Sequence, residues 1–167
     1  MTSEASPQAE PTERFARRAF RELQQLIIYH EAGAISGEVE SVHDMRVGIR
    51  RLRVALSNFA ACLPKQDRKR LRQSLENLAD ALGGVRDLDV MIEALKAKQN
   101  HKSAEDIAAL NLFIHRLQSR RRRRHRQLVS YLQGEEYAGF KREFSANGGN
   151  ETTDRRNIEE LQDEQAA

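Results

Sequence analysis

One histidine and three arginines form the most chemically informative pattern in the sequence. His43, Arg46, Arg50 and Arg53 follow one another at steps of three, four and three residues within the stretch SVHDMRVGIRRLRVAL. This spacing places them on one face of an α-helix, with Arg51 on another face. Guanidinium groups are planar forks that can donate paired hydrogen bonds to phosphate or carboxylate oxygens. The pattern therefore predicts a surface that binds anions.

The apolar residues of the same helix lie directly beside this basic stripe. They repeat at steps of three and four residues and are Val42, Met45, Ile49, Leu52, Leu56 and Phe59. The basic stripe is one residue out of phase with them, so at about 100° per residue it borders the face that must be buried. One interpretation is a solvated flank whose side-chain stems cover the edge of the core. The alternative is a basic groove beside the core, and basic residues elsewhere in the chain support it.

Two other segments supply those bases. KQDRKRLR opens with Lys65, and HRLQSRRRRRHR contains five consecutive arginines. The second segment lies in the predicted helix at 103–133. When the apolar stripe of that helix is continued at helical spacing, it reaches Arg121 and Arg124. Because an unpaired buried charge costs several kcal/mol, we expect these two side chains either to splay into water or to line an anion-binding cavity. The candidate binding residues in these segments are Arg68, Lys69, Arg72, Arg116, Arg120, Arg123 and Arg124.

Acidic residues offer weaker signals. Asp87 and Asp89 follow the Gly83–Gly84 pair, and we expect them to cap a restarted helix or to pair with arginines, rather than to bind a metal. Glu-x-x-His, the spacing of di-iron bundles, occurs at Glu40 only, whereas such a site needs two copies. We predict no catalytic residue, no metal site and no cofactor.

Apolar periodicity predicts an all-α fold, an antiparallel four-helix bundle with a short extra C-terminal helix. The four helices are expected at about 12–31, 38–63, 65–99 with a kink or restart at the double glycine, and 103–133. The short fifth helix is expected within EEYAGFKREF. Residues 1–11 and 146–167 are polar or acidic and are predicted to be disordered, which leaves a domain at 12–145.

Composition agrees with a helical protein that has a polyanionic partner. Charged residues make up 32% of the 167 and aromatic residues only 5%. The net charge of +3 is unevenly spread, since the stretch from Glu143 to the end holds seven acids and two bases, leaving a basic body. The N-terminal residues lack the apolar core of a signal peptide, and no apolar run approaches the roughly 20 residues of a membrane span. We expect a cytoplasmic protein.

The motifs together resemble the CHAD family, the conserved-histidine α-helical domain. VHDMRVGIRRLRVAL, LGGVRDLDVMIEAL and LVSYLQGEEYAGF occur in the family's order. By motif position, the resemblance implies that His43, Arg46, Arg50, Arg51 and Arg53 take over the role of the family's basic helix. It likewise matches Arg86 to the arginine that precedes the family's two aspartates.

The resemblance implies an all-helical fold whose basic groove binds inorganic polyphosphate without catalysis, with association to polyphosphate granules. Full-length members carry two four-helix halves, and this sequence is similar to the first half only. We therefore expect a single-repeat member in which a homodimer restores the second half. The alternatives are a truncated member with weak binding, or a basic module that binds nucleic acid or an acidic protein. Nucleic acid is less expected, because the segment from Arg116 to Arg126 contains no aromatic residue for stacking on bases.

Overall fold

The structure, a computed structural model, describes residues 12–101 and 103–147, and all regular secondary structure in these ranges is helical. The all-α helical-bundle prediction is confirmed. The terminal segments expected to be disordered lie outside the described residues, except for Ala146 and Asn147, which belong to the last helix. The helices are α1 (Thr12–Tyr29), α2 (Glu31–Ser36), α3 (Val39–Asn58), α4 (Lys65–Ala97), α5 (Ala104–Leu132) and α6 (Glu135–Asn147), with 3₁₀ turns at Ala60–Cys62 and Lys98–His101.

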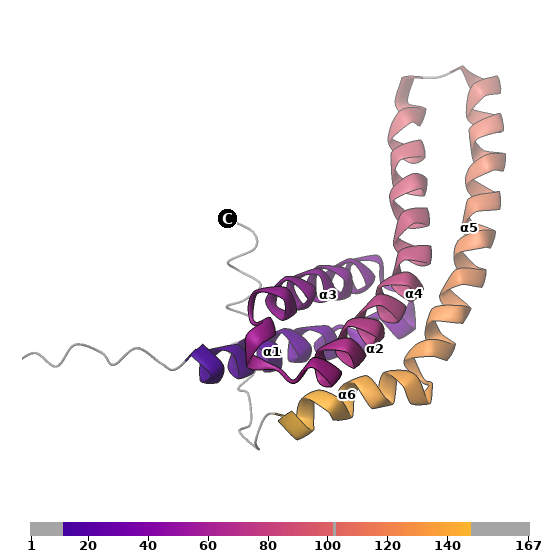
Figure 1. Ribbon diagram of the computed structural model, residues 1–167. Helices are drawn as coiled ribbons and strands as arrows, with labels where there is room; N and C mark the ends of the chain where they lie inside the picture. The colour runs from indigo at the N-terminus through magenta and orange to yellow at the C-terminus, as the bar shows by residue number, and fades with distance from the viewer. Residues whose placement is uncertain (1–11, 102, 148–167) are drawn as a thin grey trace, which may run out of the picture.

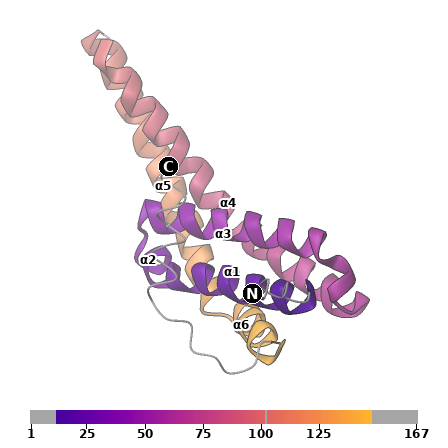
Figure 2. The same ribbon diagram turned by 90° about the vertical axis from the view of Figure 1, so that its left-hand side faces the viewer.

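The helices form a body and a projecting arm (Figures 1 and 2). In the body, α1, α3, α6 and the N-terminal part of α4 pack together. The remainder of α4 leaves the body and pairs with α5 as an antiparallel two-helix arm. α5 returns to the body in its C-terminal part, where Leu128 and Leu132 join the main core. The site described below lies on the α3–α4 side of this body.

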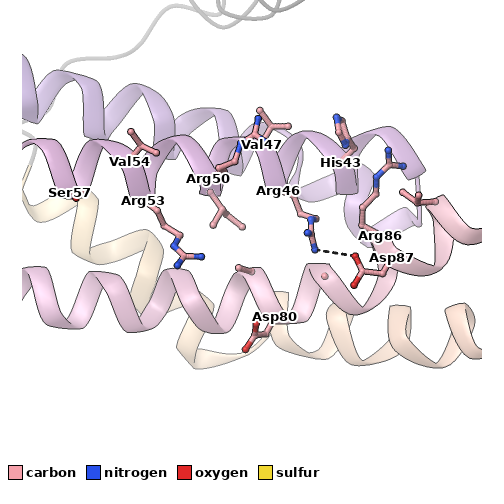
Figure 3. A pocket seen from close by; sticks show the side chains of 14 residues that line it. His43, Arg46, Val47, Arg50, Arg53, Val54, Ser57, Asp80, Arg86 and Asp87 are labelled. Carbon is pink, nitrogen blue, oxygen red and sulfur yellow. Dashed lines mark ion pairs between the residues drawn. The ribbon is translucent and has the colours of Figure 1, made fainter.

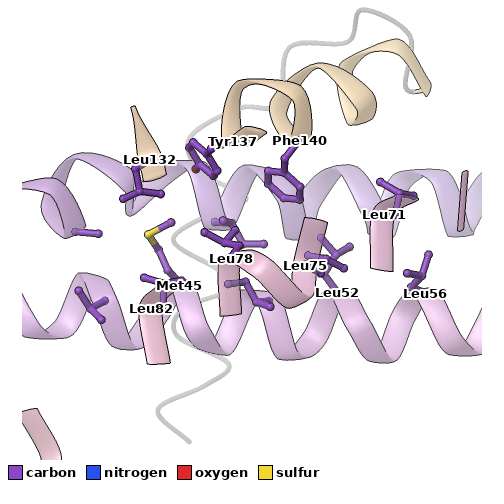
Figure 4. Packing of buried hydrophobic residues seen from close by; sticks show 14 of the residues in the cluster. Met45, Leu52, Leu56, Leu71, Leu75, Leu78, Leu82, Leu132, Tyr137 and Phe140 are labelled. Atoms are coloured by element: carbon purple, nitrogen blue, oxygen red, sulfur yellow. The ribbon is translucent and has the colours of Figure 1, made fainter. Parts of the chain in front are cut away.

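The main core is built from the apolar stripes that the sequence shows. Met45 and Leu52 of α3 face Leu75 and Leu82 of α4, and all four side chains are fully buried. Figure 4 shows Tyr137 and neighbouring residues of α6 closing this core from above. Burying a leucine or methionine side chain stabilises a fold by roughly 1.5–3 kcal/mol, so this core fixes α3 against α4.

The stretch between the first two predicted helices, 12–31 and 38–63, differs from the prediction. α1 ends at Tyr29, and Glu31–Ser36 form a separate short helix, α2. Gly37 ends α2 with a left-handed φ of 93°, a conformation that glycine adopts without a steric penalty. At the α1–α2 junction, buried His30 lies 3.8 Å from a carboxylate oxygen of Asp44 on α3. Burial lowers the pKa of His30, and Asp44 opposes that shift.

The double glycine does not restart a helix. α4 runs unbroken from Lys65 to Ala97, although Figure 1 shows its axis bending where the body gives way to the arm. The expectation that Asp87 and Asp89 cap a restarted helix is therefore wrong, since both lie in the helix interior. Their alternative role as partners of arginines is confirmed, as the ion pairs below show.

A small second core holds the arm together. Ile92 of α4 packs with Ile114 and Leu117 of α5, flanked by two partly buried leucines. Ser103 caps α5, and its hydroxyl accepts a hydrogen bond from the backbone N–H of Asp106, as expected for a helix that starts there. Polar contacts between α5 and the body, described below, add to this small core.

Candidate anion-binding site

An open groove of about 1000 Å³ separates α3 from α4 on the surface of the body (Figure 3). Its α3 wall carries the predicted basic stripe, and Figure 3 shows Arg46 and Arg53 reaching from α3 toward α4. Arg86 contributes a further guanidinium from α4. Five of the predicted site residues therefore converge on one groove: His43, Arg46, Arg50, Arg53 and Arg86.

The groove follows from the phase relation between the basic and apolar stripes of α3. Ile49 is buried in the core and also lines the groove, so the groove runs along the edge of the core. Arg50 and Arg53 are exposed, whereas His43 and Arg46 are half-buried. Partly buried stems reduce the conformational freedom of cationic heads, which lowers the entropic cost of binding an anion.

Gly83 allows Arg46 to lie close to the α4 backbone. A Cβ atom at position 83 would lie 2.7 Å from Nη1 of Arg46, closer than real Cβ contacts allow. The same Nη1 atom lies 3.8 Å from a carboxylate oxygen of Asp87, one turn further along α4. Arg46 thus spans the groove floor between the two helices.

Arg86 has a hydrogen-bond donor that no described residue satisfies. Its Nη1 atom is buried and has no hydrogen-bond partner among the residues that the structure describes. A buried donor without a partner is costly, at about 1–3 kcal/mol. Figure 3 shows this guanidinium near the His43 end of the stripe.

The groove carries an excess of positive charge. Four arginines line it together with two aspartates, Asp80 and Asp87, both on α4. The lining contains no Phe, Tyr or Trp, and its apolar members are aliphatic. The arrangement can hold several anionic oxygens through paired hydrogen bonds, but it lacks the large aromatic side chains that single-stranded nucleic-acid binders use for stacking.

A second, smaller basic pocket of about 340 Å³ lies between α4 and α5. It is lined by three predicted residues of the arginine run, Arg120, Arg123 and Arg124, together with Gly84, Asp87 and Leu88. Asp87 lines both this pocket and the groove. Arg124 lines this basic pocket, and the binding of an anion there stays a prediction.

Five predicted residues lie outside both cavities. Arg68 donates a hydrogen bond to the carbonyl of Ala60 at 3.0 Å, so it stabilises the turn between α3 and α4. Lys69, Arg72 and Arg116 are exposed elsewhere on α4 and α5, and Arg51 is half-buried on another face of α3. Helical spacing cannot separate these residues from the groove residues, because it does not reveal which faces two helices turn toward each other.

Arg121 does not follow the expectation that it would splay into water or line an anion cavity. It pairs with the carboxylate of Asp89, which is only 5% exposed, and its Nη2 donates to the carbonyl of Gly37 at 2.9 Å. Next to it, His125 forms a 2.9 Å hydrogen bond with the carbonyl of Ala34. These contacts attach α5 to the α2–α3 turn. The sequence signalled Asp89 as a partner for arginine but gave no sign of the roles of Arg121 and His125.

The fold and the groove define an all-α helical domain with a basic, solvent-open site. The sequence model of the CHAD domain matches residues 12–164, and the chain belongs to the CHAD domain family. This confirms the family resemblance drawn from the motifs. No curated protein matches the chain. Among the described helices, none has both the length and the apolar character needed to cross a membrane.

Proposed function

We propose that this chain binds inorganic polyphosphate through the α3–α4 groove and does not act on it chemically. The observation that carries the proposal is the convergence of four arginines and His43 on one open groove. Each guanidinium can donate two parallel hydrogen bonds to one phosphate, and repeated phosphates match a row of guanidiniums along a helix. Binding of this kind requires no nucleophile, general base or metal.

Charge chemistry favours a phosphate polymer over an acidic protein. A linear polyanion releases condensed counterions when arginines replace them, so affinity should fall steeply as salt rises. The aliphatic lining of the groove, from Val47, Val54 and Val90, provides no stacking surface for bases. Binding of nucleic acid or an acidic protein therefore becomes an outcome that a competition experiment can reveal.

The test is calorimetric titration of long-chain polyphosphate into the wild-type chain and an Arg46→Gln/Arg50→Gln/Arg53→Gln variant. Glutamine preserves helix propensity, so the variant should fold. A control with the same loss of charge is Arg70→Gln/Arg122→Gln/Arg126→Gln, since none of these arginines lines either cavity. We expect the groove variant to lose at least about tenfold more affinity than the control, because hydrogen bonds between charged groups contribute about 1.5–3 kcal/mol each. Equal losses in the two variants would overturn the proposal.

Competition distinguishes the alternative ligands. Polyphosphate should displace a bound oligonucleotide or acidic peptide far more effectively than either displaces polyphosphate. If the oligonucleotide or the acidic peptide displaces polyphosphate more effectively, that competitor is the ligand of the groove.

We further propose that the protein works in the cytoplasm at polyphosphate granules, and that it pairs with a second copy of itself. The arm offers a surface for such pairing, because Met91, Leu112 and Phe113 are exposed apolar residues on it. Light scattering with and without polyphosphate tests the pairing. A mass of two chains in either condition supports it, and a monomer in both contradicts it.

A further inference from the structure

The two glycines in the middle of α4 each lie beneath an arginine from a different helix. A Cβ at Gly83 would lie 2.7 Å from Nη1 of Arg46 on α3, and a Cβ at Gly84 would lie 3.3 Å from Cδ of Arg124 on α5. Gly83 lines the α3–α4 groove, and Gly84 lines the smaller pocket between α4 and α5. The double glycine therefore lies on α4 with one residue in each of the two basic cavities.

The two cavities also share a wall. At about 100° per residue, Asp87 projects from α4 between the directions of Gly83 and Gly84, one turn further along the helix. It is the residue that lines both cavities, and its side chain is 76% exposed. An anion that passes from one cavity to the other thus crosses α4 over two residues without side chains and beside one exposed carboxylate.

From this geometry we infer that one polyphosphate chain occupies both cavities and crosses α4 at Gly83–Gly84, which makes the site selective for long chains. The inference rests on the proposed function, because it assigns the groove the same ligand. Arg46, Arg50 and Arg53 hold one part of the polymer, and Arg123 and Arg124 hold the next. Once the polymer is bound in the groove, its binding in the pocket is an intramolecular step. Affinity therefore rises with chain length more than it would if each added phosphate only gave one cavity another place to bind.

A short polyphosphate cannot use both cavities. Arg46 and Arg53 are seven residues apart, about 10 Å along α3 at 1.5 Å per residue, so the three phosphates of inorganic tripolyphosphate are taken up within the groove. Tripolyphosphate should therefore depend on the groove alone. The arginine run, which the groove does not include, is then a chain-length determinant and not a second independent anion site.

The experiment compares two probes, inorganic tripolyphosphate and long-chain polyphosphate, on the full chain. The variant Arg123→Gln/Arg124→Gln removes two of the pocket's three arginines, and Arg122→Gln/Arg126→Gln removes the same amount of charge from the same helix outside the pocket. We expect the pocket variant to lose about tenfold or more in affinity for the long chain and less than about twofold for tripolyphosphate. The control variant should lose much less affinity for the long chain than the pocket variant does.

Three outcomes would overturn the inference while leaving the proposed function in place. In the first, the pocket variant binds the long chain as tightly as the wild type does. In the second, the pocket variant and the control lose the same affinity for the long chain. In the third, the pocket variant loses affinity for both probes by the same factor. Failure of the proposed function looks different, because the wild-type chain would then bind neither probe, or the groove variant would bind both as the wild type does. That result would overturn the inference as well.

Discussion

Arg46 of α3 lies over Gly83 of α4 so closely that a Cβ at position 83 would lie 2.7 Å from its Nη1 atom. The guanidinium is the free end of a flexible side chain, so an added methyl group would displace it and leave the backbone in place. The position of a groove cation thus depends on a residue that has no side chain.

Gly83→Ala should therefore separate binding from stability. Alanine favours a helix interior over glycine by about 0.5–1 kcal/mol, so the free energy of unfolding should stay level or rise. Affinity for polyphosphate should fall several-fold, because Arg46 can no longer lie on the groove floor. Urea unfolding and calorimetry measure the two quantities.

Gly139→Ala is the matched control for that substitution. Gly139 lies in α6, and a Cβ there would meet only Nη2 of Arg142, at 4.0 Å. We expect a similar gain in helix stability without a change in affinity. If Gly83→Ala binds polyphosphate as tightly as this control does, the position of Arg46 over α4 is not required for binding.

Asp87→Asn should strengthen the binding of long-chain polyphosphate. The carboxylate lies 3.8 Å from Arg46 and lines both basic cavities, so it competes with phosphate for the guanidinium and repels the polymer. Because the side chain is exposed and screened by salt, we expect a gain of only about two- to fivefold. Titration at low and high salt checks this, with the gain shrinking as salt rises. A loss of affinity would mean that Asp87 positions Arg46 for the ligand.

Asp89→Ala should destabilise the fold without a direct effect on the groove. Asp89 is 5% exposed and Arg121 is 19% exposed, so removing the carboxylate leaves a largely buried guanidinium without its ion-pair partner. Breaking such a buried pair costs about 3–5 kcal/mol. Denaturant unfolding of this variant should show that loss, and an Asp89→Leu/Arg121→Met variant should recover most of it. A loss below about 1 kcal/mol in Asp89→Ala would contradict a structural role for the pair.

His30 should make stability depend on pH. Burial lowers its pKa below 6.5, so the unfolded chain binds a proton more readily than the native state does. Stability contributed by neutral His30 is therefore complete above pH 6.5 and is lost as pH falls from 6.5 to the lowered native pKa, by at most about 1.4 kcal/mol per pH unit. Urea unfolding at neutral pH and about pH 5.5 should show a smaller loss for His30→Asn than for the wild type. Equal losses would show that other groups govern the pH dependence.

Local patterns predicted the helices and the basic edge of α3, because both depend on periodicity along one helix. The apolar positions of α3, such as Met45 and Leu52, are buried as expected, and Arg50 and Arg53 line the groove beside them. Arg72 has similar local spacing on α4 and lies outside the groove, since its place depends on how α4 is rotated against α3.

Tertiary contacts explain the rest. Arg121 was expected to face water or a bound anion, but its partner Asp89 lies 32 residues away in sequence. The glycine pair was expected to kink or restart the helix, and α4 is continuous with a bent axis, with the two glycines beneath Arg46 and Arg124. A glycine's effect on a helix and an arginine's partner are both decided by the surface that packs against them, which no single-helix pattern contains.

Protection of arginines from chemical modification tests the binding of polyphosphate in the α3–α4 groove on the unaltered protein. An arginine-specific dicarbonyl reagent, read out by peptide mass spectrometry, reports the accessibility of each guanidinium with and without polyphosphate. We expect polyphosphate to slow modification of Arg50 and Arg53 strongly, while Arg70 and Arg122, which are exposed outside both cavities, react at unchanged rates. Equal protection of all four arginines, or none at Arg50 and Arg53, would contradict this expectation.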